Sequence, residues 1–464
     1  MRDEMAKQIA FASISDLRRL LRRREVSALE LAHATLRGLD THGRRIGAVA
    51  WLTPETAERE ARAADRALRD GRGSALCGIP WGAKDLLDTA GIPTRWGAPP
   101  YRDRVPSADA TVVTRLRAAG AVLVGKLSMI ELAGAGGYRD CAASIDGPCH
   151  NPWDATRWSG GSSSGSAAAV AAGLVPFALG SETGASLVLP AAFCGVSGLR
   201  PSFGVVSRHG VMPIAWSMDK VGPLARSAAD CGVVLGAIAG TDAEDWTVRR
   251  ARVTPAASRR FRVGVLATDF SSAPAAETLF DDAIRVLGRT GIRLRDVTLP
   301  REDFLSLYDA IVAGETLAAH EAFIRGPSLD GLLDAAQRDG LREYVGRPAL
   351  AYVRAVEARV RVARRIRAMF DDVDAVIAPT ALTEATPLDT DLLAYRHGRR
   401  GGNAVLGALA GVPELSMPMG FGPAGLPLGL SVIGDQLSEP TLLRIGATYQ
   451  RETAWHLAHP AVHL

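Results

Sequence analysis

The segment from Ser159 to Pro201 constrains the fold of this chain more than any other part of the sequence. It reads SGGSSSGSAAAVAAGLVPFALGSETGASLVLPAAFCGVSGLRP and combines tight-turn residues with long apolar runs. A flexible linker is also rich in glycine and serine, but it lacks such apolar runs. The run from Ala167 to Ala172 is a strong helix former that directly follows the first glycines and serines. We therefore expect tight loops that lead into buried elements.

Length and composition indicate a packed globular protein. The chain has 464 residues, of which 47% are hydrophobic and 22% are charged, which is far from the composition of a disordered chain. The longest apolar stretch, residues 167–180, is broken by Gly173 and Pro176 and is shorter than the roughly 20 residues that span a bilayer. The first residues are charged and lack the apolar core of a signal peptide. We therefore expect no membrane association.

The basic residues are almost all arginines. The chain contains four lysines, so arginine supplies the other 50 of the 54 basic residues. The net charge is only +4, and the arginines are spread along the chain rather than gathered into the basic patch of a nucleic-acid binder. Arginine cannot accept a proton near neutral pH, whereas a lysine with a lowered pKa can. A specific role is therefore considered for each lysine: Lys7, Lys84, Lys126 and Lys220.

Alternating helices and short apolar runs indicate an α/β sheet with helices on both faces. Ser27 and Glu30 form a capping box at the start of one amino-terminal helix. We predict helices near residues 54–68, 110–119, 167–172, 276–287, 352–370 and 440–453. We predict strands near residues 79–84, 121–124, 261–266, 292–297, 375–378, 414–417 and 428–433.

The chain shows no internal repeat and no convincing linker. The sequence therefore predicts a single domain over residues 1–464. Within it, residues 1–70 form amino-terminal helices, residues 78–240 contain the glycine- and serine-rich core, and residues 241–464 form a more variable part with carboxy-terminal core strands.

Several familiar catalytic motifs are not supported by their context. Residues 161–165 match G-x-S-x-G, but the polar segment before them does not predict the strand that a nucleophile elbow needs. Residues 217–220 match S-x-x-K, but no lysine follows to supply the K-T-G strand of penicillin-binding enzymes. The nine histidines show no metal-ligand spacing, and no Walker A loop or dinucleotide-binding turn occurs. We therefore expect neither a metal nor an organic cofactor.

The five cysteines are scattered without a CxxC pair, which predicts free thiols and a cytoplasmic location. Cys194 is the candidate for a cysteine nucleophile. It lies in the apolar run AAFCGV, which is typical of a buried structural thiol.

Two serines stand out by their context. Ser162 sits in a double-glycine loop before a helix, and Ser186 sits in a second small-residue turn before an apolar run. Such turns can present successive backbone N–H groups to one point, as an oxyanion hole requires. The same residue types also build ordinary tight turns and helix N-caps, and this interpretation stays open for a single loop. Two such loops in a chain with isolated lysines favour the catalytic interpretation.

These segments resemble the signature of the amidase signature family. The family pattern is a G-G-S-S loop, an Ala-rich helix, a T-D-x-G-G-S-like turn and an apolar run that ends near Pro and Cys-Gly. A strand that ends in Lys-Asp is its second landmark and is matched here by Lys84-Asp85. Further matches follow in the expected order over nearly the whole chain: Gly125-Lys126, Asn151-Pro-Trp153, Asp219 to Arg226, Ala378-Pro-Thr380, Gly411-Val-Pro and Gly425 to Gly429.

The resemblance implies a fold and a set of site residues. The fold is a large twisted mixed β-sheet of about eleven strands, covered by helices on both faces. Lys84 resembles the general base of the family, Ser162 its bridging serine, usually held in a cis peptide, and Ser186 its nucleophile. The oxyanion hole would consist of the backbone N–H groups of Thr183, Gly184, Ala185 and Ser186.

Such a triad is chemically coherent. A serine hydroxyl is a poor nucleophile until a base takes its proton. A lysine can be that base only when neutral, so its surroundings must lower its pKa. A bridging serine can accept one proton while it donates another, and it would thereby connect Lys84 with Ser186. The resemblance thus implies an amidohydrolase that forms a covalent acyl-enzyme.

Four residues near the site depart from the family pattern. Ser164 and Ala185 stand where glycine is usual, Glu182 stands where aspartate is usual, and Val188 stands where many members carry arginine. A Cβ at Ala185 restricts the backbone beside the oxyanion hole, because a positive φ is costly for alanine. If the family's arginine pairs with the acid, Glu182 needs another partner, such as a backbone donor.

The residues beside Lys84 and the remaining lysines receive structural interpretations. Lys126 lies at a strand end, where the family often has Gly-Lys; it fits a structural ion pair, with a catalytic role as the alternative, and Lys220 fits a structural or surface role. Asp85 is expected to help position the end of the strand that carries Lys84.

We expect a cytoplasmic amidohydrolase that acts on a small-molecule amide, has no nucleic-acid partner and forms a homodimer, the last on base rates alone. One alternative is the catalytic subunit of a tRNA-dependent amidotransferase, which needs partner subunits. Others are a biosynthetic acyltransferase that uses the same acyl-enzyme and a non-catalytic binding module. The substrate cannot be read from the sequence, and we expect the pocket walls in residues 127–137, 205–216, 305–320 and 380–403.

Overall fold

The computed structural model describes residues 9–249, 260–300, 302–398 and 405–461. Its centre is one sheet of 11 strands. The strands are β1 (Val49–Leu52), β2 (Pro80–Lys84), β3 (Val122–Leu127), β6 (Phe177–Glu182), β7 (Ser197–Arg200), β8 (Lys220–Ala225), β9 (Arg262–Leu266), β10 (Arg293–Val297), β11 (Ala375–Pro379), β12 (Glu414–Phe421) and β13 (Pro427–Ile433).

The sheet is mixed, with the order β1-β3-β2-β6-β8-β7-β12-β13-β11-β9-β10. Strand β2 runs parallel to both of its neighbours, β3 and β6. The middle of the sheet, from β6 through β8, β7 and β12 to β13, is antiparallel. The predicted large mixed sheet is therefore confirmed.

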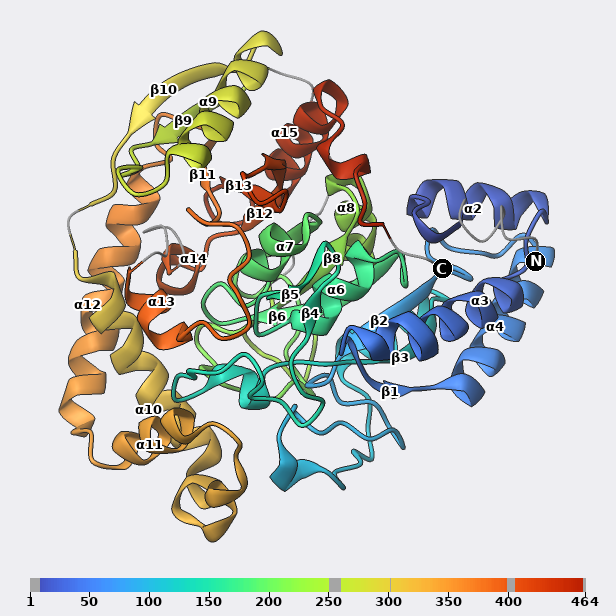
Figure 1. Cartoon of the computed structure of the whole chain (residues 1–464), viewed down its shortest axis with the longest axis horizontal. Helices are drawn as coiled ribbons and strands as arrows, with labels where there is room; N and C mark the ends of the chain where they lie inside the picture. The colour runs from blue at the N-terminus through green and yellow to red at the C-terminus, as the bar shows by residue number, and fades with distance from the viewer. Residues whose placement is uncertain (1–8, 250–259, 301, 399–404, 462–464) are drawn as a thin grey trace.

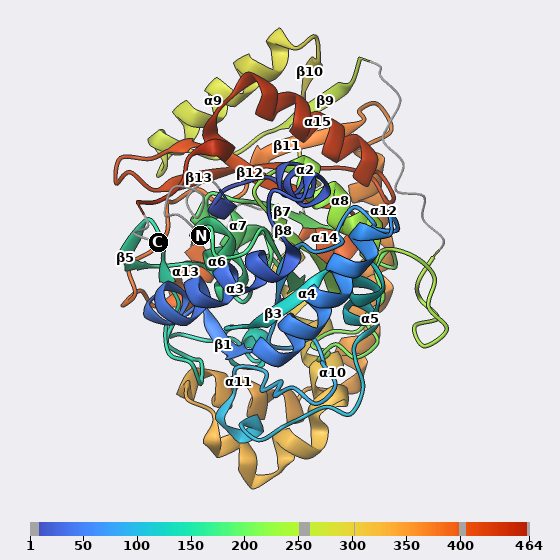
Figure 2. The same ribbon diagram turned by 90° about the vertical axis from the view of Figure 1, so that its right-hand side faces the viewer.

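Helices cover the sheet on both faces (Figures 1 and 2). Helices α2 to α4 gather at one end of the molecule, and α10 to α12 gather at the opposite side (Figure 1). The helices are α2 (Ile14–Arg23), α3 (Ala28–Gly38), α4 (Pro54–Arg69), α5 (Thr111–Ala118), α6 (Ser164–Ala171), α7 (Val188–Cys194), α8 (Ala228–Ile238), α9 (Pro274–Arg289), α10 (Phe304–Arg325), α11 (Ala335–Val345), α12 (Ala349–Ala368), α13 (Leu392–Gly398), α14 (Leu406–Ala410) and α15 (Glu439–Glu452).

The predicted elements are present, with ends that differ by up to a few residues. The capping box of Ser27 and Glu30 forms at the start of α3 with both of its hydrogen bonds. Among the elements that the sequence did not predict are β6, β8 and α10. Strand β6 was missed for two reasons. It ends in Gly180, Ser181 and Glu182, which are small or polar residues that do not indicate a strand. All six of its residues are buried, so it also lacks the alternation of polar and apolar residues that marks a half-buried strand.

The expectation that no strand precedes the G-x-S-x-G match at 161–165 is wrong. A short strand, β5 (Asp154–Trp158), pairs with β4 (His150–Asn151) just before it. This strand is polar because its middle residues face the surface. It belongs to a separate two-stranded ribbon, however, whereas a nucleophile elbow leaves the central sheet.

Helix α6 is buried along its whole length. It packs against β2, β3, β6 and β8, and its small side chains allow this close approach. A Cβ at Gly165 would lie 2.4 Å from the carbonyl oxygen of Ala48 and 2.6 Å from the backbone nitrogen of Ser128, so only glycine fits there. The Ala-rich run after the serine loop is therefore a core element, as the sequence predicted.

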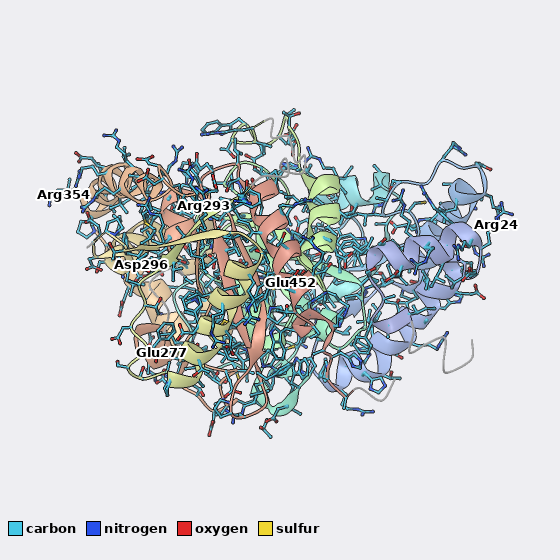
Figure 3. The ribbon with its side chains drawn as sticks, turned by 90° about the horizontal axis from the view of Figure 1, so that it is seen from above. Arg24, Glu277, Arg293, Asp296, Arg354 and Glu452 are labelled. Carbon is cyan, nitrogen blue, oxygen red and sulfur yellow. The ribbon has the colours of Figure 1, made fainter. Side chains whose placement is uncertain are left out.

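The surface carries charges of both signs, and the labelled residues in Figure 3, such as Arg24 and Arg354 at opposite ends, are all exposed. The five cysteines are free and buried. Within the described residues, no helix is both long and apolar enough to cross a membrane.

Candidate active site

Neighbouring elements bring the residues of the predicted triad to one edge of the sheet. Lys84 is the last residue of β2, and β6 runs parallel beside it, so the carboxyl ends of the two strands meet. Ser162 lies in the loop before α6, and Ser186 lies in the turn between β6 and α7. The backbone N–H of Ser163 donates to the Ser186 carbonyl at 3.1 Å and joins the loop to the turn.

Lys84 is fully buried among hydroxyl groups. Its Nζ lies 2.8 Å from the Oγ of Ser162 and 3.0 Å from the Oγ atoms of both Ser163 and Ser181. Burial lowers the pKa of Lys84 to about 7, although two buried carboxylates nearby act in the opposite direction. A large fraction of this amine is therefore neutral at physiological pH, as a lysine base requires.

Sequence reasoning did not single out Ser163 and Ser181. The Ser163 hydroxyl donates to the Ser181 carbonyl at 3.2 Å and accepts from the Ser181 backbone N–H at 3.3 Å. A hydroxyl has one hydrogen, and Ser163 uses it for Ser181, so Ser163 must be the acceptor in its contact with Lys84. Ser163 could have been found as the neighbour of Ser162, but Ser181 reaches the amine only because β6 lies beside β2.

Ser162 and Ser186 differ in their surroundings. The peptide bond between Gly161 and Ser162 is cis, as the resemblance implied, and the Ser162 side chain is buried against Lys84. Ser186 is partly exposed, and its hydroxyl makes no hydrogen bond to another described residue. The structure thus shows a direct contact between Lys84 and Ser162, while the Ser186 hydroxyl stands at the edge of a cavity.

The turn from Thr183 to Ser186 presents unpaired backbone donors. None of its four backbone N–H groups donates to another described residue. The Thr183 hydroxyl donates to Asp219 at 2.6 Å and fixes the start of the turn. Ala185 has a φ of 70°, which is the left-handed region that favours glycine. Consecutive donors in such a turn can bind a negatively charged oxygen.

Glu182 has the backbone partners that the sequence led us to expect, and also an arginine. Its carboxylate accepts hydrogen bonds from the N–H groups of Leu187 at 2.9 Å and Val188 at 3.0 Å. It also accepts from Arg200, at the end of β7, at 2.5 Å. Glu182 therefore has a cationic partner even though Val188 stands where many members of the family carry arginine.

The Ser186 turn borders a cavity of about 60 Å³. Much of its wall comes from the predicted regions, in residues 133–137, 308–312 and 392–395, whereas residues 399–403 of the last predicted region lie outside the described residues. A Cβ on Gly184 would lie 2.6 Å from the Tyr308 hydroxyl, so a larger residue there would push the Tyr308 ring out of its place in this wall. The aromatic side chains of the wall are Tyr138, Trp158, Tyr308, Tyr344 and Tyr395.

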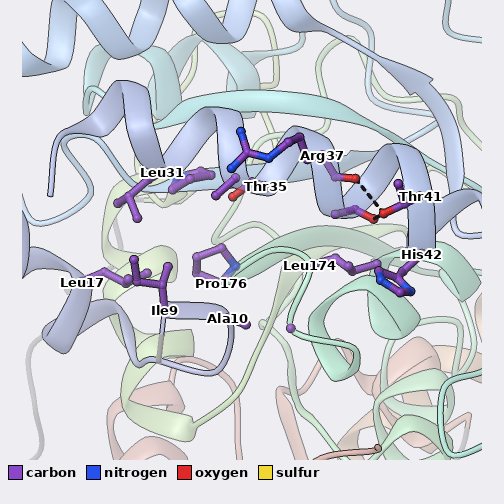
Figure 4. A pocket seen from close by; sticks show the side chains of 14 residues that line it. Ile9, Ala10, Leu17, Leu31, Thr35, Arg37, Thr41, His42, Leu174 and Pro176 are labelled. Carbon is purple, nitrogen blue, oxygen red and sulfur yellow. Dashed lines mark hydrogen bonds between the residues drawn. The ribbon is translucent and has the colours of Figure 1, made fainter. Parts of the chain in front are cut away.

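A second cavity, of about 310 Å³, lies between α3 and the loop that precedes β6 (Figure 4). Leu17, Leu31 and Pro176 form part of its apolar lining, and Arg37 and Thr41 lie along one side. None of the predicted site residues contributes to it.

A model of the family described as Amidase matches residues 30–443. The chain belongs to the amidase signature family. Among curated proteins, the chain is 37% identical to the A subunit of the glutamyl-tRNA(Gln) amidotransferase of Roseiflexus sp. strain RS-1, over 97% of its length and 98% of the relative. It is 38% identical to the protein of the same name from Chloroflexus aurantiacus, over 94% and 95% of the two chains.

Solved structures agree with this assignment. The peptide amidase of Stenotrophomonas maltophilia is 33% identical with a TM-score of 0.84, over 95% of this chain and 97% of that one. A chain of a structure described as a vestigial protein complex that reveals the evolutionary origins of an s-triazine catabolic enzyme is 30% identical with a TM-score of 0.85, over 95% of this chain and 98% of that one. The fold and the family of the chain are thereby established.

The other two lysines that the structure describes, Lys126 and Lys220, are buried and hold neighbouring segments of the chain together. Lys126 donates to the Leu87 carbonyl at 2.5 Å and to the Thr94 hydroxyl at 2.7 Å, and it lies 4.0 Å from Asp85. Lys220 is buried and donates to the Gly407 carbonyl at 3.3 Å, so the surface role considered for it is excluded.

Asp85 follows Lys84 directly in the chain but makes no hydrogen bond to its side chain. It accepts from the Arg95 backbone N–H at 3.1 Å and so ties the end of β2 to the following loop, as expected. Among the described residues, no group of three or more histidine, cysteine or acidic side chains could hold a metal ion.

Proposed function

We propose that this member of the amidase signature family cleaves the C–N bond of a carboxamide through a covalent acyl-enzyme on Ser186. The observation that carries the proposal is the buried contact between Lys84 and Ser162, 2.8 Å long, beside a turn of unpaired backbone donors that contains Ser186. Lysine with a pKa of about 7 can exchange protons through a bridging hydroxyl near neutral pH.

The first step forms the acyl-enzyme. Neutral Lys84 takes the proton of Ser162 while Ser162 takes the proton of Ser186, whose Oγ attacks the carbonyl carbon. The carbonyl oxygen gains the electron pair and is bound by the N–H groups of residues 183–186. When the tetrahedral intermediate collapses, its C–N bond breaks, and the proton stored on Lys84 passes through Ser162 to the nitrogen. Ammonia or an amine leaves.

The second step returns the enzyme to its starting state. A water molecule gives one proton to Ser162, which passes its own proton to Lys84, and the hydroxide attacks the ester carbonyl. The bond to Ser186 breaks, the carboxylic acid leaves, and Ser186 regains its proton through Ser162. Protons and electron pairs balance over the two steps.

Labelling tests this proposal directly. A fluorophosphonate probe should form one adduct, which mass spectrometry of peptides places on Ser186. Ser186→Ala should abolish both labelling and turnover of a panel of amides while circular dichroism stays unchanged. Undiminished turnover by folded Ser186→Ala would refute the assignment.

The curated relatives favour a second candidate, in which the amide is the side chain of glutamine and the chain is one subunit of a tRNA-dependent amidotransferase. The chemistry at Ser186 would be the same, but the ammonia would pass to a partner protein. The relatives with 37% and 38% identity are both named as the A subunit of such an amidotransferase, and the similarity covers nearly their whole length.

Ammonia release separates the two candidates. We would measure it from glutamine and from an amide panel, with the protein alone and with the other amidotransferase subunits from the same genome. Glutamine turnover that appears only with those subunits and charged tRNA supports the second candidate. Turnover of other amides by the protein alone supports the first.

A further inference from the structure

A single buried side chain closes the turn that carries Ser186. Glu182 precedes the turn, and its Oε2 accepts hydrogen bonds from the N–H groups of Leu187 and Val188, which follow it. The carboxylate therefore links the two ends of the turn. A shift of this carboxylate would therefore also shift the turn, with its four backbone donors and the Ser186 hydroxyl.

Arg200 determines where the carboxylate lies. Its Nη1 donates to the Oε1 of Glu182 at 2.5 Å and lies 2.9 Å from the Oε2 of Glu414. Its Nη2 donates to the Val412 carbonyl at 3.2 Å. The arginine side chain is 0% exposed, and each carboxylate is 1% exposed. Because β7 and β12 are central strands, this contact connects the turn with the rigid part of the sheet.

The rest of the fold makes room for this arginine. A Cβ on Gly407 would lie 1.7 Å from the Nη2 of Arg200, so the guanidinium occupies space that any other residue would fill. Ser431 also donates to the Oε1 of Glu414 at 2.5 Å, which holds the second carboxylate in place. The guanidinium is thus fixed from the side opposite the turn.

The ionisation of Glu182 also depends on Arg200. Burial alone would raise the pKa of Glu182, but the charge and hydrogen bond of Arg200, together with the hydrogen bonds from the Val188 and Leu187 N–H groups, lower it below its usual value. Glu182 is therefore an ionised carboxylate in a dry interior. Without its cation, a buried carboxylate must take up a proton or move toward water, and either change alters its hydrogen bonds.

We propose that Arg200 is a positioning residue for the Ser186 turn: through Glu182 it holds the nucleophile and the unpaired backbone donors in the geometry that acylation needs. This inference rests on the proposed function. It also explains how a chain with Val188 in place of the family's frequent arginine keeps a cation on its acid, since the guanidinium comes from β7 instead.

The test measures the rate at which a fluorophosphonate labels Ser186, per folded molecule, together with hydrogen exchange of the peptide that spans residues 183–189. Arg200→Met should slow labelling on the order of 10- to 100-fold, because small misplacements of reacting groups cost this much. It should also speed exchange in that peptide. Arg200→Lys, which keeps the charge but not the planar fork, should restore part of the rate.

Arg115→Met is the matched control. Arg115 also donates to two backbone carbonyls, those of Ile238 and Thr241, but it is only partly buried and lies outside the network of Glu182. It should lower stability without changing the labelling rate of folded protein. A labelling rate and an exchange rate that are unchanged in Arg200→Met would overturn the proposal.

A second variant covers the case in which Arg200→Met does not fold. Arg200→Met with Glu182→Gln removes the charges of this pair but keeps a side-chain oxygen for Leu187 and Val188, and Glu414, whose pKa burial raises, can take up a proton when the arginine is gone. It should fold, with labelling slower than wild type and faster than in Arg200→Met where that variant is soluble. Wild-type rates in the double variant would overturn the proposal. If the wild type is not labelled, the proposed function fails, and the exchange rates alone decide the role of Arg200.

Discussion

At the scale of single residues, the proposed chemistry depends on one buried amine. Burial lowers the pKa of Lys84 to about 7, and the protonated form cannot accept a proton. We therefore expect kcat/KM to rise about tenfold per pH unit on the acidic side and to level off above a pH of about 7. A pH–rate profile measured with a neutral amide checks this. A flat profile between pH 5 and 8 would contradict the assignment of Lys84 as the base.

Lys84→Arg should be nearly as damaging as Lys84→Ala. A guanidinium stays charged at all relevant pH values, so it can donate to Ser162 but cannot take its proton. We expect both variants to lose turnover by at least about a hundredfold, the usual contribution of a general base. The comparison uses single-turnover labelling, with circular dichroism to show that each variant is folded. Substantial activity in Lys84→Arg would count against a proton-accepting lysine.

Ala185→Gly should stabilise the protein slightly and leave labelling of Ser186 intact. At a φ of 70°, an L-residue is strained by about 1–2 kcal/mol, whereas glycine costs about 0.5–1 kcal/mol in backbone entropy. The free energy of unfolding should therefore rise by up to roughly 1.5 kcal/mol in a denaturant titration.

The matched control is Ala318→Gly, at an exposed position inside α10. It has no such strain to relieve, so its free energy of unfolding should fall by about 0.5–1 kcal/mol. Equal losses in the two variants would show that the left-handed backbone of Ala185 carries no strain.

At the scale of elements, the site depends on how closely α6 approaches the sheet. Gly165→Ala would place a Cβ 2.4 Å from a backbone oxygen that cannot move away. We expect a loss of about 1–3 kcal/mol in the free energy of unfolding and slower labelling of Ser186, because the Ser162 loop leads directly into this helix.

Gly236→Ala in α8 is the corresponding control, because nothing lies within 4 Å of its new Cβ and the position is exposed. Gly236→Ala should instead raise the free energy of unfolding by about 0.5–1 kcal/mol. Thermal melts of the two variants should thus shift in opposite directions. A Gly165→Ala protein as stable as wild type would mean that α6 has room to move away from the sheet.

At the scale of the whole molecule, one sheet takes strands from every part of the chain. β1 to β3 come from the first third and lie at one edge, β9 to β11 lie at the other, and one hydrophobic cluster extends from Leu17 through Leu224 to Ile433. We therefore expect a single cooperative transition in calorimetry, with calorimetric and van't Hoff enthalpies that agree. Two separated transitions would contradict the predicted single domain.

Sequence and tertiary structure determined different parts of this protein. The family, the mixed sheet and the positions of Lys84, Ser162 and Ser186 could be predicted, because local motifs carry them: a Lys-Asp strand end, a double-glycine loop and a small-residue turn. The buried helix α6 could be predicted as well, because its small apolar residues have few other places to pack.

Other features of the site come from chain segments far apart in sequence, and no local pattern encodes them. The contact of Ser181 with Lys84 exists because β6 pairs with β2, and the contact of Arg200 with Glu182 exists because β7 lies near the end of β6. The lowered pKa of Lys84 likewise results from burial by all of these elements together. The sequence by itself determined which groups are the candidates for the reaction, and the tertiary structure decided their protonation and their placement, because burial and long-range contacts arise only when the sheet is assembled.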